Sequence, residues 1–185
     1  MQRPTEPSTV TIRPATAADV PALELLIAAS ARRLSRDFYT IAEVEAAITH
    51  VFGVDTDLVS DGSYLVAEDG AALLGCGGWS ARRTLFGGDR FAARETGRLD
   101  PATDAARIRA FFVAPDQARR GVGSAVLDAC EAAAAAAGFR TTTLMATLPG
   151  VPFYARHGYH AAEAVRLDLG GVGVRFVPMI KTLSL

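Results

Sequence analysis

The sequence has very little cysteine, no long apolar run and no excess of charge of either sign. Its two cysteines, Cys76 and Cys130, lie far apart and in no metal-ligand spacing, which argues against a disulfide framework and a zinc site. We interpret both as buried free thiols in a reducing compartment. No stretch is long and apolar enough to cross a membrane, and residues 1–10 lack the apolar core of a signal peptide. We therefore expect a cytoplasmic protein that binds neither a metal nor a membrane.

The charge balance argues against nucleic acid as a bulk partner. The chain carries 19 basic and 20 acidic side chains, whereas nucleic-acid-binding proteins usually show a basic excess. Lys181 is the only lysine; arginine suits phosphate and carboxylate groups, although such a bias equally reflects genome composition. The length of 185 residues is that of one ordinary domain. We predict a disordered segment 1–8 and a single domain 9–185.

Hydrophobic periodicity in the first half predicts both strands and helices. "TVTIRPA" alternates as a strand, and residues 19–31 carry apolar side chains at helical spacing. Thr40 and Glu43 form a capping box for a helix that ends near His50. "SYLVAED" and "AALLGCGGWS" read as two strands joined by a tight turn. Residues 81–107 then lack strong periodicity, and so long a segment usually carries function or hides a short element.

The second half contains the longest predicted helix. "RIRAFFV" reads as a strand that ends before Pro115, and residues 121–137 read as an alanine-rich helix closed by Gly138 and Phe139. The expected apolar stripe of this helix is Val122, Val126, Cys130, Ala133 and Ala137. "TTTLMAT" predicts a strand and "VPFYARH" a short helix, and "YHAAEAVRLDL" and "VGVRFVPMI" predict two closing strands.

The turn "ARRGVGS", residues 118–124, lies between a strand and this helix. Free backbone N–H groups and the dipole at a helix start favour an anion there, and Gly121 and Gly123 permit close approach. A Walker loop would need a Gly-Lys-Ser/Thr sequence, which is missing. A dinucleotide fingerprint would need a third glycine where Val126 stands. The dinucleotide interpretation is therefore weak, and a third interpretation is the pyrophosphate of coenzyme A.

Two segments carry a family resemblance. "FFVAPDQARRGVGSAVLDACEAAAAAAGF" resembles the cofactor motif of the GCN5-related N-acetyltransferases (GNAT), and "LMATLPGVPFYARHGY" is similar to their second motif. Together the motifs cover residues 107–160. The resemblance implies an α/β fold with a mixed central sheet of about six to seven strands, flanked by helices and splayed between its two central parallel strands. It also implies acetyl-CoA as co-substrate, and the closing strands would suit the homodimers common in this family.

By position in the motif, the resemblance assigns main-chain roles to two groups of residues. The pyrophosphate cradle is Ala118, Arg119, Arg120, Gly121, Val122, Gly123 and Ser124. The contacts to the pantetheine arm fall to Phe111, Phe112 and Val113, with a backbone N–H near Val113 polarising the acetyl carbonyl. The chain departs from the family pattern at Ala118, where Arg or Gln is common, and at residues 148–150, where many relatives carry an asparagine.

The resemblance also suggests catalytic residues. Tyr154 matches the tyrosine that protonates the coenzyme A sulfur in many relatives; the alternative is a core aromatic. The strand before the turn lacks the glutamate that many relatives use as base, so the candidates are His50, Glu68, Glu95 and Asp104, or a water chain that ends at one of them. We interpret His157 and His160 as surface or packing residues.

We expect an acceptor pocket where the first helices and residues 81–107 approach the acetyl end. Its candidate lining residues are Phe38, Tyr39, His50, Trp79, Phe86 and Phe91. Arg82 and Arg83 either meet an acidic acceptor or form a solvated strand end. The favoured function is acetyl transfer from acetyl-CoA to a primary amine of a small molecule or peptide by direct attack on the thioester. The alternatives are a catalytically inactive acyl-CoA binding or sensing domain and an unrelated nucleotide-binding enzyme.

Overall fold

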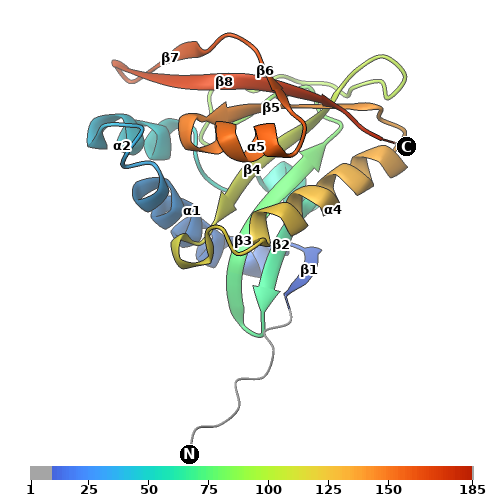
Figure 1. Cartoon of the computed structure of the whole chain (residues 1–185), viewed down its shortest axis with the longest axis horizontal. Helices are drawn as coiled ribbons and strands as arrows, with labels where there is room; N and C mark the ends of the chain where they lie inside the picture. The colour runs from blue at the N-terminus through green and yellow to red at the C-terminus, as the bar shows by residue number, and fades with distance from the viewer. Residues whose placement is uncertain (1–9, 185) are drawn as a thin grey trace, which may run out of the picture.

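The computed structural model describes residues 10–184 (Figure 1), so the segment 1–8 that we predicted to be disordered lies outside the described residues. The strands are β1 Thr11–Pro14, β2 Tyr64–Asp69, β3 Ala72–Ser80, β4 Ala106–Val113, β5 Thr141–Thr147, β6 His160–Ala161, β7 Val165–Leu169 and β8 Val172–Thr182. The α-helices are α1 Val20–Leu34, α2 Ile41–His50, α3 Thr56–Ser60, α4 Val122–Ala136 and α5 Val151–Arg156. Three short 3-10 turns are η1 Ala17–Asp19, η2 Pro115–Gln117 and η3 Leu148–Gly150.

The predicted caps set the ends of two helices. At the start of α2, the Thr40 hydroxyl accepts the Glu43 N–H (3.2 Å) and the Glu43 carboxylate accepts the Thr40 N–H (2.8 Å), which confirms the capping box. At the end of α4, Gly138 has a φ of +94° and the Phe139 N–H donates to the carbonyl of Ala134 (3.1 Å). The helix therefore ends in the predicted glycine cap, with Phe139 buried behind it.

The buried stripe of α4 differs from the prediction at its C-terminal end. Val122, Val126 and Cys130 are buried as expected, but the next buried residue is Ala134, and Ala137 is exposed. A step of four residues stays on one face of the helix, so the stripe advances from Cys130 to Ala134 and not to Ala133. Both cysteines are buried and free, as expected.

Within residues 10–184 the strands form one eight-stranded sheet in the order β1-β2-β3-β4-β5-β8-β6, with β7 also paired to β8. All pairs are antiparallel except β4 with β5, which are parallel. This central pair joins only at Ala106 with Thr142 and at Arg107 with Thr143, after which the strands diverge. The expected mixed sheet with a central splay is confirmed. It has one strand more than the expected range because the segment after α5 contributes two short strands.

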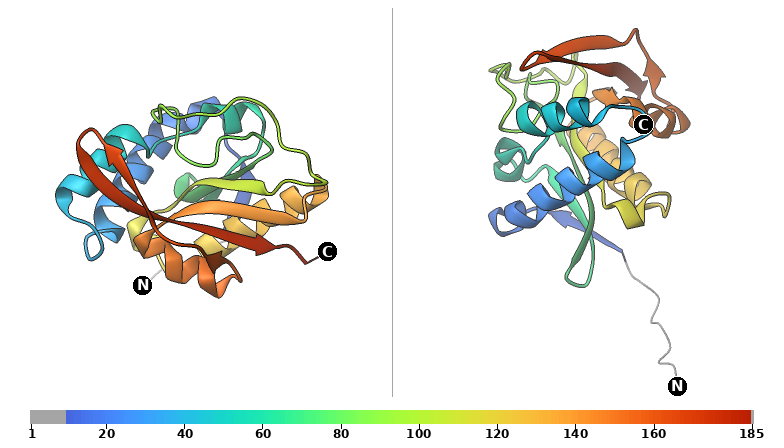
Figure 2. Two further views of the ribbon diagram at one scale, coloured as in Figure 1. Left: turned by 90° about the horizontal axis from the view of Figure 1, so that it is seen from above. Right: turned by 90° about the vertical axis from the view of Figure 1, so that its left-hand side faces the viewer.

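Helices cover both faces of the sheet (Figures 1 and 2). Helices α1 and α2 pack on one face with a core that includes Leu23, Ile27 and Phe176. Helices α4 and α5 pack on the other face, where Leu127 and Tyr154 belong to a second core. Because side chains alternate along a strand, β4 and β5 contribute to both cores, and the splay lies between them.

A β-bulge in β4 lies beside the splay. Ala110 has a φ of +50°, and the register between β3 and β4 shifts opposite it, between Cys76 and Gly78. A left-handed conformation costs an alanine about 1–2 kcal/mol, so neighbouring contacts must hold it. The hydroxyl of the fully buried Tyr64 donates to the Ala110 carbonyl (3.0 Å). The bulge therefore fixes the direction of the strand just before the predicted cofactor turn.

Residues 81–105 follow β3 without a helix or a strand and are held by ion pairs. Arg94 donates to Asp57 (2.7 Å) and Asp55 (3.2 Å), and Arg82 donates to Asp61 (2.7 Å). The three carboxylates belong to α3 and its flanks, a helix too short for hydrophobic periodicity to predict. These pairs hold a segment that forms one wall of the cavity described next.

Candidate active site

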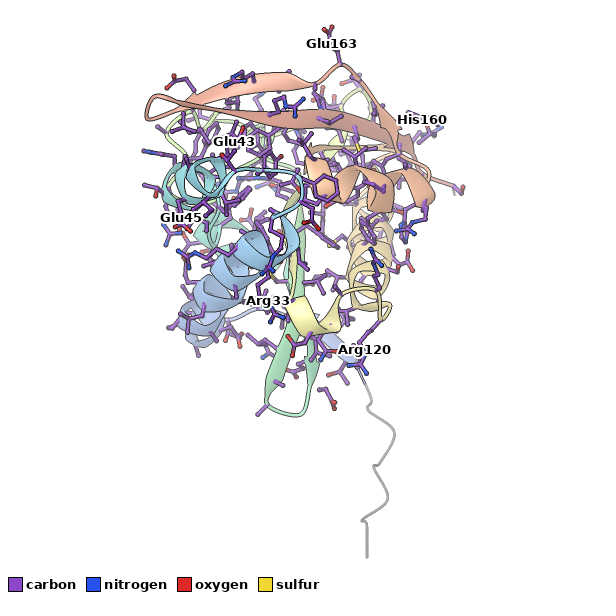
Figure 3. All side chains as sticks on the ribbon, turned by 60° about the vertical axis from the view of Figure 1, so that its left-hand side comes forward. Arg33, Glu43, Glu45, Arg120, His160 and Glu163 are labelled. Atoms are coloured by element: carbon purple, nitrogen blue, oxygen red, sulfur yellow. The ribbon has the colours of Figure 1, made fainter. Side chains whose placement is uncertain are left out.

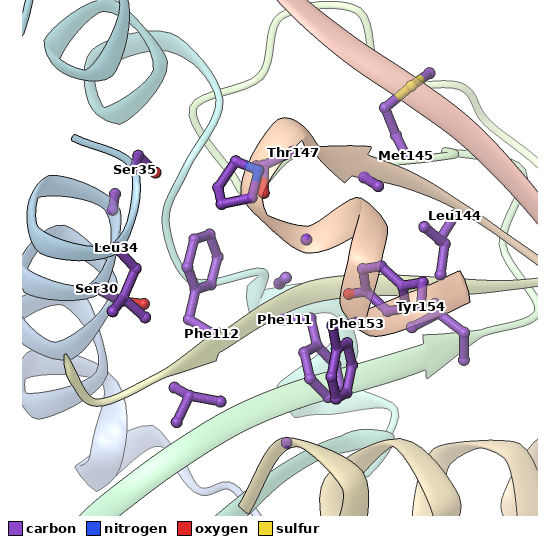
Figure 4. A pocket seen from close by; sticks show the side chains of 18 of the residues that line it. Ser30, Leu34, Ser35, Phe111, Phe112, Leu144, Met145, Thr147, Phe153 and Tyr154 are labelled. Atoms are coloured by element: carbon purple, nitrogen blue, oxygen red, sulfur yellow. The ribbon is translucent and has the colours of Figure 1, made fainter. Parts of the chain in front are cut away.

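A cavity of about 740 Å³ occupies the splay between β4 and β5. On the side of α4 and α5 its wall includes Phe111, Val113 and Phe153, and on the side of α1 and α2 it includes Leu34 and Phe112. Figure 4 shows α1 residues on one side of the cavity and Tyr154 on the other, with Phe112 between them. The cavity thus passes through the sheet, so two ligands can approach each other from opposite faces.

The N-terminus of α4 opens into this cavity without a capping side chain. Gly121 is the N-cap residue with a φ of +86°, and the first hydrogen bond runs from the Ala125 N–H to the Gly121 carbonyl (3.0 Å). The N–H groups of residues 122–124 precede it and have no helical acceptor. Among the described residues, and apart from the chain immediately next to Gly121, no atom lies within 4 Å of the position that a Cβ on Gly121 would occupy. Free amides, open space and the dipole of a 15-residue helix fit a bound pyrophosphate.

The predicted cradle residues divide into two groups. Ala118, Arg119, Gly121, Gly123 and Ser124 line the cavity. Arg120 is exposed at the turn before α4 (Figure 3), and the Val122 side chain is buried beneath the helix. The last two residues can therefore contribute only main-chain groups or a distant charge.

The edge of β4 that faces β5 is open along the cavity. Phe112 and Val113 pair with Cys76 and Gly75 of β3, but β4 makes no pair with β5 beyond Arg107. Phe111, Phe112 and Val113, which the resemblance assigns to the pantetheine arm, all line the cavity. An extended ligand can therefore bind along this edge in the manner of an added strand.

Tyr154 of α5 lies in the cavity wall with its ring among other aromatic rings. Its centroid is 6.0 Å from that of Phe111 and 5.1 Å from that of Phe153. Within residues 10–184 no group forms a hydrogen bond with its hydroxyl, which points toward the middle of the cavity in Figure 4. Burial raises the pKa of Tyr154 well above its usual range. The hydroxyl is therefore protonated at neutral pH and is available as a proton donor.

His157 links α5 to the start of α4. Its Nδ1 lies 2.9 Å from the Phe153 carbonyl oxygen and its Nε2 lies 3.0 Å from the Ser124 hydroxyl. A carbonyl can only accept, so Nδ1 carries hydrogen, and in the neutral ring Nε2 accepts from Ser124. This agrees with the predicted packing role and adds a contact to the cradle. His160 is exposed on β6 and points outward in Figure 3.

Of the six residues predicted to line the acceptor pocket, Phe38 and Phe86 line the cavity, whereas Tyr39, His50, Trp79 and Phe91 do not. The Tyr39 hydroxyl donates to the Arg175 carbonyl (2.6 Å) and accepts the Leu148 N–H (2.9 Å), so Tyr39 holds η3 and β8 to the α1–α2 turn. Trp79 packs edge-on against Phe139, with ring centroids 6.2 Å apart, in a separate core cluster. His50 is exposed at the end of α2, beside Gly170 of the β7–β8 turn.

The other candidate bases also lie outside the cavity wall. Glu68 pairs with Arg13 (2.8 Å), Asp104 accepts the Asp100 N–H (2.8 Å), and Glu95 is exposed on the segment after β3. No aspartate or glutamate occurs among the described residues that line the cavity. The arrangement therefore brings a proton donor to the cavity but no carboxylate base.

Several residues of the cavity wall were not predicted from the sequence. They include Ser30, Leu34 and Ser35 of α1 and its end, Phe52 after α2, and Phe176 of β8. The aperiodic segment gave a signal for Phe86 and its neighbours Gly87 and Gly88, which do line the cavity. Leu34 and Phe176 belong to apolar patterns that are the same whether the residues face a core or a cavity.

One buried ion pair supports the wall. Arg109 of β4 and Asp55 before α3 both have fully buried side chains and form a close ion pair. Arg109 Nη2 also donates to the Gly87 carbonyl (2.7 Å). Burial lowers the pKa of Arg109, and the charge of Asp55 opposes this. The pair ties β4 to α3 and to the segment that carries Phe86.

The structure describes residues 10–184 of the chain. Within this part, no helix is long and apolar enough to cross a membrane. No cluster of three or more histidine, cysteine, aspartate or glutamate residues suited to a metal ion occurs in the same part.

The fold and the cavity define a class of protein. It is an α/β protein in which two parallel strands diverge next to a helix N-terminus that has no capping side chain. Such a site can bind an extended ligand that carries an anionic group. Residues 92–183 match the family model described as acetyltransferase (GNAT) domain. Over this segment the resemblance to the GCN5-related N-acetyltransferases is confirmed, and acetyl-CoA is the co-substrate that enzymes of this family use. A comparison with curated protein sequences found no match.

Solved structures show the same fold. A GCN5-related N-acetyltransferase from Rhodopseudomonas palustris is 24% identical, with a TM-score of 0.70 over 95% of this chain and 97% of that chain. PaiA N-acetyltransferase from Thermoplasma acidophilum, crystallised with coenzyme A, is 15% identical, with a TM-score of 0.64 over 95% and 99%. Ribosomal-protein-alanine N-acetyltransferase from Brucella melitensis is 16% identical, with a TM-score of 0.61 over 94% and 99%.

Proposed function

We propose that this protein transfers an acetyl group from acetyl-CoA to a primary amine of a small molecule or peptide by direct attack on the thioester. One observation carries the proposal. The cavity leads from the uncapped start of α4, past the unpaired hydroxyl of Tyr154, to the opposite face of the sheet. Such a passage lets an anionic ligand and a second reactant meet inside the protein.

The cofactor half of the cavity accounts for binding. The amides of residues 122–124 hold the pyrophosphate, and Arg119 on the cavity wall adds positive charge. The departure at Ala118 leaves this cradle intact because its donors belong to the main chain. The open edge of β4 offers N–H and C=O groups to the amides of the pantetheine arm. An N–H near Val113 would then stabilise the negative charge that develops on the acetyl oxygen.

The chemical step needs one proton donor and one proton acceptor. The amine nitrogen forms a bond to the acetyl carbon while the carbon–sulfur bond breaks, and the sulfur takes the proton of the Tyr154 hydroxyl. The attacking nitrogen releases its extra proton to water, because no carboxylate lines the described part of the cavity. Tyr154 regains its proton from solvent before the next turnover.

The lack of a lining carboxylate also favours a second candidate function. An acyl-CoA binding or sensing domain would keep the cradle and the β4 edge but would need no base. The two candidates differ in turnover and share cofactor binding. An experiment therefore has to measure both quantities on the same protein.

The first measurement is the melting temperature with coenzyme A, ATP or NAD. Coenzyme A should raise it, because binding to the native state alone stabilises a protein, and equal shifts with ATP would refute the cofactor assignment. The second measurement follows thiol release from acetyl-CoA over a panel of amines. Release that depends on an amine supports the enzyme, whereas binding without any release supports the sensing domain.

A variant of the cradle supplies the control. A Cβ on Gly123 would lie 3.3 Å from the Phe153 ring and 3.5 Å from Val113 Cγ2, so Gly123→Val should obstruct the cavity and abolish the shift with coenzyme A. Ala136→Val changes an exposed position at the far end of the same helix and should keep the shift. Equal loss in both variants would show that the effect comes from the stability of the helix.

A further inference from the structure

The half of the cavity on the side of α1 and α2 is lined by aromatic rings. We call this part the acceptor chamber and define it by Leu34, Phe38, Phe52, Phe86, Phe112 and Phe176. Ring centroids of Phe52 and Phe112 are 5.3 Å apart, those of Phe52 and Phe176 are 6.3 Å apart, and those of Phe86 and Phe176 are 5.8 Å apart. Four segments distant in sequence thus build one continuous aromatic wall.

Charged groups near the acceptor chamber already have partners. Glu24 accepts the Val54 N–H (2.8 Å) and pairs with Arg90 (2.5 Å), and the fully buried Asp55 pairs with Arg94 and Arg109. Of the other basic residues on the cavity wall, Arg119 precedes α4, and Arg156 and His157 lie at the end of α5. Both carboxylates are engaged, so a second positive charge on an acceptor would leave water without gaining a partner, which is costly.

Two hydroxyl groups provide the polar character of the chamber. Ser30 and Ser35 are each 4% exposed and line the cavity. Neither hydroxyl has a hydrogen-bond partner within residues 10–184, and Figure 4 shows both on the α1 side of the cavity, across from Phe112 and Tyr154. Buried hydroxyls normally form hydrogen bonds. These two can bond a neutral polar group of a ligand.

We infer that the acceptor is a primary amine whose body is aromatic and carries no second positive charge. This inference rests on the proposed acetyl transfer and names the class of its second substrate. The ring of the acceptor would pack among Phe52, Phe86 and Phe112 in the edge-to-face geometry that the wall itself uses. The amino group would point through the splay toward Tyr154, and a hydroxyl on the ring would reach Ser30 or Ser35. Polyamines and aminoglycosides are excluded because each carries several charges.

The test compares three amines at one pH and saturating acetyl-CoA: 2-phenylethylamine, 1-butylamine and 1,4-diaminobutane. Burial of the ring should make kcat/KM for 2-phenylethylamine about tenfold or more higher than that for 1-butylamine. 1,4-Diaminobutane should be no better than 1-butylamine. A preference for the diamine, or equal rates for the first two amines, would overturn the inference and leave the proposed acetyl transfer standing. Without amine-dependent release, both proposals would fail together.

A variant at the rim of the chamber sharpens this test. Phe38 is 47% exposed, so a charge there can be tolerated by the fold. Phe38→Asp should shift the kcat/KM ratio toward 1,4-diaminobutane by about tenfold, because a carboxylate then meets the second ammonium group. Phe38→Leu is the matched control and should keep the wild-type order. An unchanged ratio in Phe38→Asp would show that acceptors do not pass this rim.

Discussion

Two neighbouring tyrosines allow catalysis and stability to be separated. The ring centroids of Tyr154 and Tyr159 are 5.6 Å apart, and both side chains are buried. The Tyr154 hydroxyl has no partner in the described chain, whereas the Tyr159 hydroxyl shares a 2.9 Å hydrogen bond with the hydroxyl of the fully buried Thr142. Replacing each tyrosine by phenylalanine removes one oxygen atom from the same aromatic cluster, with opposite expected consequences.

Tyr154→Phe should leave the free energy of unfolding within about 0.5 kcal/mol of the wild type, because no partner loses a hydrogen bond. A general acid contributes about 10²–10⁴ in rate, so kcat should fall about 100-fold or more while the Kd for coenzyme A stays constant. Tyr159→Phe leaves the buried Thr142 hydroxyl unpaired, at a cost of about 1–3 kcal/mol. At about 2–4 °C per kcal/mol for a chain of this size, its Tm should fall measurably while kcat stays within about twofold.

The assays are urea unfolding, a coenzyme A titration and thiol release with one amine, all run on both variants. If Tyr154→Phe keeps the wild-type kcat, Tyr154 has no part in proton transfer. If Tyr154→Phe loses as much stability as Tyr159→Phe, its hydroxyl has a partner inside the fold, and the proton-donor argument fails for that reason. Loss of activity in Tyr159→Phe at full stability would move the catalytic role to the other tyrosine.

Three further predictions concern pH, the β4 edge and the buried ion pair. The kcat/KM should rise with pH up to about pH 10, because the amine loses its own proton to water. Tyr154 stays protonated over this range, since burial raises its pKa above the usual value near 10. A bell-shaped profile with a maximum near pH 7 would contradict this. In Gly77→Ala the new Cβ would lie 2.2 Å from Phe111 Cδ2, so Tm and coenzyme A affinity should both fall, and Phe111→Leu in the same chain should restore part of each in thermal and binding measurements. Arg109→Met should cost about 3 kcal/mol in urea unfolding, because the buried Asp55 loses the closer of its two arginine partners and keeps Arg94 at 3.2 Å. A smaller loss in Arg109→Met with Asp55→Asn would verify the cause.

Much of the fold could be predicted from local signals. The Thr40–Glu43 capping box, the Gly138–Phe139 cap and the alternation of the closing strands each determine structure within a few residues, so the sequence displays them directly. The divergence of β4 and β5 was predicted from the family resemblance alone, since no local sequence pattern shows where two strands diverge. Helix α3 escaped prediction because five residues are too few to show a period.

The site was less predictable than the fold. The predicted cradle residues are contiguous in the chain, so one motif named all seven together, and five of them line the cavity. The acceptor chamber joins single residues from distant elements, and Phe52 and Phe176 contact each other across more than a hundred positions of sequence. His50 and Trp79 were plausible by residue type, but the register of α2 and the side-chain alternation of β3 direct them elsewhere.

The short junction at the centre of the sheet has a mechanical consequence. Strands β4 and β5 pair only at Ala106 and Arg107 of β4. The sheet therefore consists of two halves, β1–β4 and β5–β8, that are joined at one end. A ligand that forms hydrogen bonds along the open edge of β4 and also contacts β5 would hold the angle between the two halves of the sheet constant. Binding of acetyl-CoA would then make the acceptor chamber more rigid, because its walls belong to both halves of the sheet. The stiffness of the sheet would in this way favour binding of the amine as the second reactant.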